Sequence, residues 1–226
     1  MKLPFNVEQF LQLFKDYNLY VFPLQVLFYN LALVIFFLSM KRIAWTDRIA
    51  NSILAFLWLW MGTVYHLLFF TTINKAAYVF SGLFIVQGIL FIYYGVIKSR
   101  LAYRFRANIV GFIGLVLIIF ALVVYPLLSH LFGHIYPSSP TFGLPCPTTI
   151  FTFGVLLWTD RKIPLFILFI PFLWCIIGFS AAIQLGMRED TTLLIAGITA
   201  VGVLLFKKQK FQSSCRASSL VEDDTL

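Results

Sequence analysis

Three residues between positions 129 and 154 have side chains that could together hold a metal ion. His130 and His134 are four positions apart, so one helical face could present both imidazoles, and Cys146 follows in the same segment. Two histidines and a thiolate suit zinc or another borderline-soft metal. Because no carboxylate stands near them in the sequence to orient the histidines, we predict no bound cofactor. The alternative is that the histidines are interfacial and Cys146 is a small packed side chain.

Cys146 also stands at the start of a short helix that could bind a solute. The uncharged stretch 147–159 would be about 20 Å long as a helix, whereas the hydrocarbon core of a bilayer is about 30 Å thick. A helix that begins inside the membrane presents unpaired N–H groups and the positive end of its dipole, which also favours a thiolate. The alternative is that residues 137–147 form a rigid structural plug. The candidate residues for a small polar or anionic solute are Cys146, Thr148, Thr149 and Thr152.

The composition indicates that these residues belong to a membrane protein. The chain has 226 residues, of which 61% are hydrophobic and 12% are charged, and its mean hydropathy is +0.92. Soluble domains carry about a quarter charged residues, and one soluble core could not bury so much apolar surface. The net charge of +8 gathers beside the apolar stretches, where it would meet anionic lipid. We therefore predict an all-α bundle of transmembrane helices, with the lipid bilayer as its partner and no nucleic acid.

The apolar stretches predict the arrangement of the chain as one transmembrane domain over residues 1–206. Seven spans are expected, the fifth and seventh of them short, at about 18–40, 49–71, 76–97, 108–128, 147–159, 163–187 and 191–206. Most of the 17 Lys and Arg residues fall on one side, which the positive-inside rule assigns to the cytoplasm. The N-terminus is then outside and the C-terminus cytoplasmic.

The two ends of the chain differ from the spans. An amphipathic pattern predicts an interfacial helix over residues 5–16, with Asn6 and Gln9 as a capping box at its start. The alternative is that this stretch is an extension of the first span. Residues 207–226 are polar, and we expect them to form a disordered cytoplasmic tail.

No Asp, Glu, Lys or Arg lies inside any predicted span. Proton- and sodium-coupled carriers usually need such a residue within the membrane, so we do not expect a carrier of that class. The polar residues inside the spans are expected to hydrogen-bond between helices, and they are Gln25, Asn30, His66, Gln87 and Gln184. Small residues at four-residue spacing predict close packing of the sixth and seventh spans through Gly178, Ala182, Gly186, Ala196 and Ala200.

Three blocks of the sequence carry a resemblance that covers nearly the whole chain, ending around Phe206. They are LPFNVEQFLQLFKDYN, GHIYPSSPTFGLPCPTTIFTFG and IPFLWCIIGFSAAIQLGMREDTTLLIAG. Together they resemble a bacterial family of uncharacterised polytopic membrane proteins, classed under a domain of unknown function. The resemblance implies the fold and a place in the bacterial cell membrane, that is the inner or plasma membrane. It implies no catalytic residue.

Three functions are compatible with these observations. The first is a channel or facilitator for a small polar or anionic solute, built on the start of the helix at 147. The second is an accessory or assembly protein in which the segment before that helix is purely structural. The third is a membrane enzyme or metal protein that uses His130, His134 and Cys146. We assign no enzymatic activity, and the sequence also allows a homo-oligomer.

Overall fold

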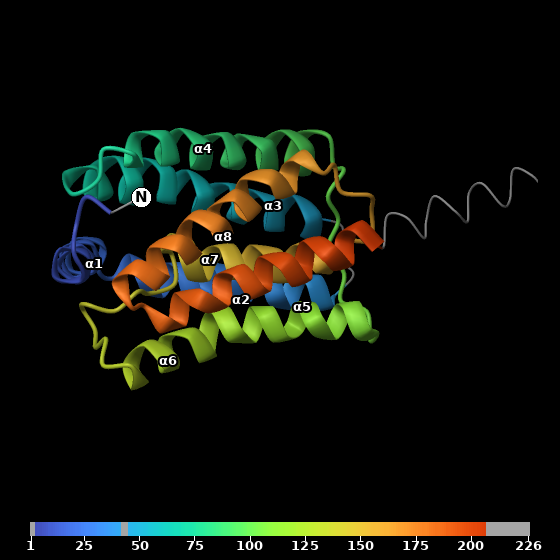
Figure 1. Cartoon of the computed structure of the whole chain (residues 1–226). Helices are drawn as coiled ribbons and strands as arrows, with labels where there is room; N and C mark the ends of the chain where they lie inside the picture. Colours follow the sequence, from blue (N-terminus) through green and yellow to red (C-terminus); the bar gives the residue numbers. More distant parts are fainter. Residues whose placement is uncertain (1–2, 42–44, 207–226) are drawn as a thin grey trace, which may run out of the picture.

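The computed structural model describes residues 3–41 and 45–206, and the predicted tail at 207–226 lies outside that part of the chain. Within it the fold is all-α, as predicted, and most helices run along a common axis (Figure 1). A last helix, Arg188–Phe206, follows the eight labelled ones. Those eight are α1 (Val7–Val21), α2 (Leu24–Met40), α3 (Thr46–Trp60), α4 (Ala77–Leu90), α5 (Ile109–Ile119), α6 (Tyr125–Leu131), α7 (Pro145–Leu157) and α8 (Phe166–Leu185).

Three helices continue through wider turns, which hold more residues than an α-helical turn. A π-helical stretch, Met61–Phe69, prolongs α3, and another, Phe91–Ile97, prolongs α4. A third, Phe120–Val124, joins α5 to α6. Pro126 stands in the first turn of α6 and has no N–H to donate to the preceding turn, so the regular hydrogen-bond ladder changes there.

The described residues contain five stretches that are long and apolar enough to cross a membrane. They are Thr46–Thr72, Ala77–Ile97, Ile109–Leu131, Phe166–Leu185 and Arg188–Phe206. α1 and α2 meet the same condition only as a pair, which would be a sixth span with a bend of 83°. α7 is apolar but has 13 residues. Five or six spans are therefore present in this part of the chain, and the seventh stays a prediction.

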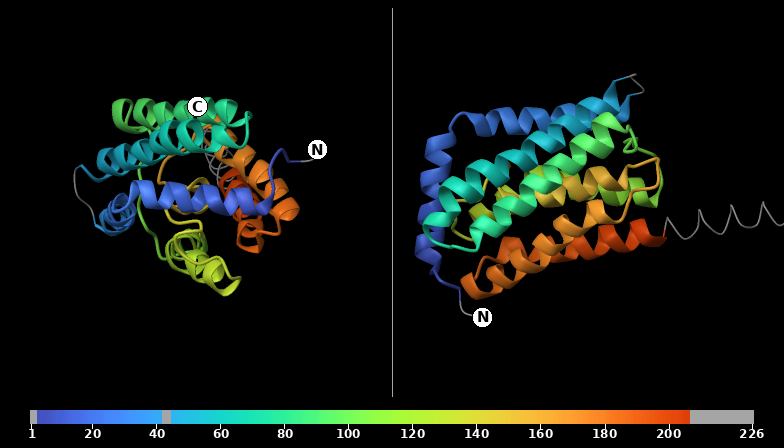
Figure 2. Two further views of the ribbon diagram at one scale, coloured as in Figure 1. Left: turned by 90° about the vertical axis from the view of Figure 1, so that its left-hand side faces the viewer. Right: turned by 90° about the horizontal axis from the view of Figure 1, so that it is seen from above.

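The first helix is longer than predicted and crosses one end of the bundle. It begins at Val7 with the expected capping box, in which Asn6 and Gln9 each accept a hydrogen bond from the other's backbone N–H, at 2.9 and 3.0 Å. It ends at Val21 and not at 16. The helix that follows begins only at Leu24 and not at 18, because Pro23 interrupts the chain where it turns by 83°. Figure 2 shows α1 lying crosswise over this end, called the α1 end below.

α7 lies in the middle of the bundle (Figure 1), and each of its residues except Cys146 is buried. α5 approaches it very closely through two glycines. A Cβ atom on Gly154 would lie 2.9 Å from the carbonyl oxygen of Gly114, and one on Gly114 would lie 2.8 Å from that of Gly154. Next to the two glycines, the Trp158 indole N–H donates a hydrogen bond to the Gly111 carbonyl at 2.9 Å. The two backbones meet at a distance that only glycine permits.

α8 and the last helix also pack through small residues, in partial agreement with the prediction. Gly178 faces Leu193, Gly197 faces Cys175, and Ala196 is buried. Gly186 does not belong to this contact, because it ends α8 in the left-handed conformation with a φ of 71°.

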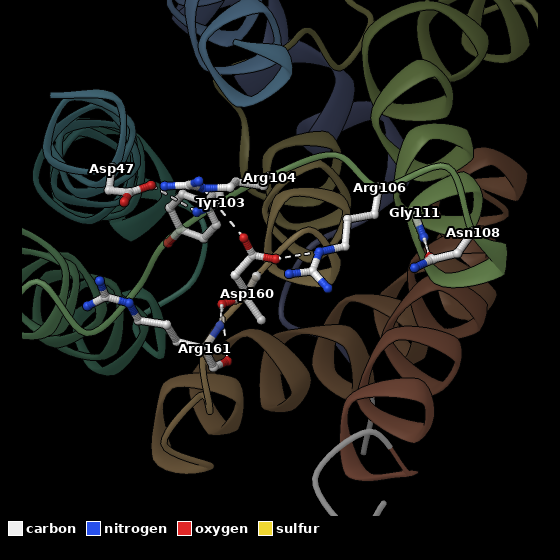
Figure 3. A network of polar contacts seen from close by, with 9 residues as sticks. Asp47, Tyr103, Arg104, Arg106, Asn108, Gly111, Asp160 and Arg161 are labelled. Atoms are coloured by element: carbon white, nitrogen blue, oxygen red, sulfur yellow. Dashed lines mark hydrogen bonds and ion pairs between the residues drawn. The ribbon is translucent and has the colours of Figure 1, made fainter. Parts of the chain in front are cut away.

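The opposite end of the bundle carries a cluster of cationic side chains and is called the basic end below. Figure 3 shows how the connection between α4 and α5 is held there against the end of α7. Asp160 pairs with Arg106 at 2.8 Å and with Arg104 at 3.5 Å, and the Arg161 guanidinium donates to the Ser99 carbonyl. The cationic residues of this end, among the described ones, include Lys41, Arg48, Lys98, Arg100, Arg104, Arg106, Arg161 and Lys162.

Tyr103 joins the same connection to α3. Its backbone N–H donates to the Asp47 carboxylate at 3.0 Å, and its hydroxyl donates to the side-chain oxygen of Asn51 at 2.7 Å. Burial, together with the negative charge of Asp47, raises the pKa of the Tyr103 hydroxyl well above its ordinary value. The hydroxyl therefore stays a hydrogen-bond donor at neutral pH, and this end of the bundle is fixed by buried polar contacts.

Candidate functional site

The segment between α6 and α7 folds over the α1 end and is tied down by Asn18. The side-chain amide of Asn18 donates to the carbonyl oxygens of Pro137 and Ser139 at 2.7 and 2.8 Å, and its oxygen accepts from the Thr141 hydroxyl at 2.8 Å. Gln25, at the start of α2, donates to the Asn18 carbonyl at 2.8 Å. α1, α2 and the segment before α7 are therefore joined by one polar contact group.

The three threonines of the predicted solute site are fully buried inside the bundle. The Thr148 hydroxyl accepts from the Gly143 backbone N–H at 3.1 Å. The Thr152 hydroxyl donates to the Thr148 carbonyl at 2.8 Å and accepts from the Trp58 indole N–H at 3.1 Å. The Thr149 hydroxyl makes no hydrogen bond to a described residue. Two of the three hydroxyls thus hold the start of α7 in place.

The predicted metal ligands lie apart. His130 is exposed at the end of α6, whereas His134 places Nδ1 2.7 Å from Oε1 of Glu189. Cys146 lies beside a different carboxylate, that of Asp190. Within residues 3–41 and 45–206, no three His, Cys, Asp or Glu side chains are grouped as a metal ion would require. The orienting carboxylate that the sequence appeared to lack is nevertheless present, since Glu189 supplies it to His134.

Two buried carboxylates are the feature that sequence reasoning missed. Glu189 and Asp190 follow the turn at Gly186 and are 0% and 4% exposed. The Ser129 hydroxyl donates to Glu189 at 3.2 Å, and the Tyr125 hydroxyl donates to Asp190. The predicted span bounds leave these acids between the sixth and seventh spans, whereas in the structure they fold inward at the start of the last helix. A usable signal was present, because Tyr125 and Ser129 are polar and one turn apart on an otherwise apolar helix, and so require a partner.

The polar residues expected to bond between helices behave in three ways. Gln25 reaches α1, as predicted, whereas Asn30 and Gln184 bond to carbonyls of their own helices, at 2.7 and 3.1 Å. His66 and Gln87 are fully buried, and their side-chain nitrogen and oxygen atoms find no hydrogen-bond partner among the described residues. His66 is surrounded by aromatic rings, so its environment is that of a packed core residue.

A cavity of about 400 Å³ lies at the α1 end, between α1, α4, α8 and the segment before α7. Asp190 is the only charged residue among the described residues that line it, and Cys146 lies next to Asp190. The cavity reaches the outer face of α8 at Ile176, which is 48% exposed. The aromatic residues of its wall include Phe10, Phe14, Tyr65, Phe70, Phe80 and Trp174.

Cys146 faces this cavity from the first turn of α7. A Cβ atom on Gly178 would lie 3.8 Å from both the Cys146 sulfur and the Trp174 indole nitrogen, so this thiol and this ring are neighbours. The Cys146 thiol also lies beside the Asp190 carboxylate, which can accept a hydrogen bond from it. Cys146 therefore acts here as a small hydrogen-bond donor at the wall of the cavity.

The long apolar helices and the many apolar side chains on the outer surface define the chain as a multi-pass α-helical membrane protein. The chain belongs to a family of unknown function, DUF6064, whose model matches residues 7–217. This match confirms the resemblance found in the sequence. No curated protein and no solved structure matches the chain.

Proposed function

We propose that this membrane protein binds a small amphiphilic molecule in the cavity at the α1 end, with the apolar part among the aromatic rings and the polar part at Asp190 and Cys146. The support is the cavity itself, about 400 Å³ in volume with apolar walls and few polar groups. Sites for small molecules have volumes of about 300–1,000 Å³ and the same distribution of polar and apolar surface.

The position of the cavity fits a ligand taken from the bilayer. α1 is amphipathic and crosses the end of the bundle, as a helix in the membrane interface would. The cavity opens along the outer face of α8, where Ile176, Ser180 and Gln184 line it. A molecule dissolved in the outer leaflet could enter from the side. Entry from the outer leaflet requires that the protein lie in a bacterial cell membrane with its N-terminus outside the cell. We include this orientation in the proposal.

A channel or facilitator for an anionic solute is less favoured by the same geometry. Its expected site at the start of α7 uses the Thr148 and Thr152 hydroxyls for internal contacts. Around the middle of α7, described aromatic side chains such as Trp58, Phe151 and Phe153 are fully buried and fill the space. Among the described residues that line the cavity, the one charged side chain is the acidic Asp190, and a carboxylate would repel an anion.

Labelling with a photoreactive amphiphile tests the proposal. The protein is placed in phosphatidylcholine nanodiscs and irradiated with a diazirine derivative of dodecanol, with unlabelled dodecanol as competitor. Ala181 lines the cavity and is half-buried, so Ala181→Phe should fill it and reduce competable labelling about tenfold. The matched control is Ile183→Phe, on the exposed face of the same helix. Equal labelling of the wild type and both variants would overturn the proposal.

A further inference from the structure

We infer that the ligand of this cavity carries a cationic head group, an ammonium or a similar cation, that pairs with Asp190. The inference rests on the proposed function and names the class of molecule. Three independent features of the cavity support it: the contacts of Asp190, the placement of the nearby cations and the rings of the wall.

The first feature is the set of partners that Asp190 has within the protein. Its carboxylate is 4% exposed, accepts a hydrogen bond from the Tyr125 hydroxyl and lies beside the Cys146 thiol. Both are neutral donors. A buried carboxylate with neutral partners alone is poorly stabilised, because a buried charge normally needs an opposite charge. A ligand cation would supply it.

The second feature is that the neighbouring cations are directed elsewhere. His134 makes its direct contact with Glu189, at 2.7 Å, and acts on Asp190 only through a charge interaction without a hydrogen bond. The Arg188 side chain is exposed, and its guanidinium lies 5.9 Å from the centre of the Phe132 ring. No Lys, Arg or His is among the described residues that line the cavity. Within that part of the chain, the wall therefore has one negative charge and no positive one.

The third feature is the aromatic wall. The face of an aromatic ring attracts a cation, most strongly for Trp, and a neutral or anionic head group gains nothing from it. The Trp174 ring lies beside Cys146, which in turn lies beside Asp190. Tyr65, Phe70 and Phe80 complete the same part of the wall. A carboxylate beside an aromatic wall offers an ammonium group an opposite charge together with rings that can attract it.

A matched series of competitors tests the head group. Dodecylamine, dodecyltrimethylammonium, dodecanol and dodecanoate are compared for displacement of the photoreactive dodecanol probe in phosphatidylcholine nanodiscs, whose lipid has no net charge. In the wild type, the two cations should displace the probe at concentrations about tenfold lower than dodecanol, and dodecanoate should be weaker. In Asp190→Asn the advantage of the cations should disappear. Asp16→Asn, which removes an exposed carboxylate from α1, should retain it.

The outcomes separate this inference from the proposed function. If all four competitors displace the probe equally in the wild type, the cationic head group is wrong and the amphiphile site stands. If Ala181→Phe leaves competable labelling unchanged, the site itself is wrong. If Asp190→Asn does not fold, the competitor series in the wild type still tests the inference. The inference requires that the wild type prefer the two cations over dodecanol by at least about tenfold. An equal loss of preference in Asp16→Asn would point to surface charge and would overturn the inference.

Discussion

His134 and Glu189 meet at 2.7 Å although 55 residues separate them in the chain. The contact joins the end of α6 to the start of the last helix at the edge of the cavity, and Glu189 is fully buried. The Ser129 hydroxyl is the other hydrogen-bond donor to the same carboxylate oxygen, at 3.2 Å. The pair therefore fixes the turn that also places Asp190 at the cavity.

Replacement of His134 by Phe is expected to lower the free energy of unfolding by about 3 kcal/mol, because it leaves a buried carboxylate with only the Ser129 hydroxyl. The free energy of unfolding is measured by titration with SDS in mixed micelles, with tryptophan fluorescence as the signal. His130→Phe, one turn earlier and exposed, should change it by less than about 0.5 kcal/mol. The double variant H134F/E189M should recover part of the loss. Equal losses in the two single histidine variants would contradict the prediction.

Gly154→Ala is expected to destabilise the bundle by about 2 kcal/mol, because the added methyl group would lie 2.9 Å from the Gly114 carbonyl oxygen and force α5 and α7 apart. Gly82→Ala is the matched control, since no atom lies within 4 Å of its added Cβ. That variant should unfold at the same SDS fraction as the wild type or at a slightly higher one, because Ala favours the helix more than Gly does. If Gly154→Ala is as stable as the wild type, the prediction is wrong, because α5 and α7 can then move apart without loss of stability.

Two adjacent turns of α7 give a paired test of the threonines. Thr152→Val removes the acceptor of the Trp58 indole N–H and should destabilise the protein by about 1–2 kcal/mol, because the buried donor is left unpaired. Thr149→Val removes a buried hydroxyl that has no described partner, so it should be neutral or stabilising. The same SDS titration compares them. If Thr149→Val instead abolishes a transport activity without changing stability, the solute-site hypothesis would regain support.

The orientation predicted from the basic residues can be tested with single cysteines. The starting protein has Cys146, Cys175 and Cys215 replaced by Ser. Lys75→Cys then places an exposed thiol in the turn before α4, at the α1 end, and Arg100→Cys places one in the connection between α4 and α5, at the basic end. A membrane-impermeant maleimide should label the first in intact cells and the second only after permeabilisation. The reverse pattern would mean that the C-terminus is outside.

Local patterns in the sequence predicted the long helices well. The apolar stretch at 76–97 corresponds to Ala77–Ile97, and the one at 108–128 to Ile109–Leu131, because a lipid-facing helix must be apolar along its whole length. The capping box at Asn6 was also visible, because both of its members lie within one turn. An apolar stretch or a capping box involves residues that are close in the sequence, so the helix it predicts can be found without knowledge of the tertiary fold.

The candidate site could not be predicted in the same way. Tyr125 and Asp190 are 65 residues apart, and no local rule states which helices become neighbours in a bundle. The acids next to Arg188 look like a solvated loop, because three charged residues in a row between apolar stretches usually face water. Only the turn at Gly186, and polar partners on a distant helix, bring two of them inside. Cys146 was selected for its helix start, but its neighbour Asp190 changes its chemistry.

The burial of α7 has a consequence for how the protein is made. A segment of 13 residues is shorter than the roughly 20 apolar residues that insert into a bilayer on their own. In the first stage of membrane protein assembly, independent helices insert, and in the second they associate. α7 belongs to the second stage, because its contacts with α5 and with Trp58 are made by helices that must already be in place. We therefore expect α7 to reach its final position only after α3 and α5 have inserted, and defects in α5–α7 packing to appear first as failed biogenesis.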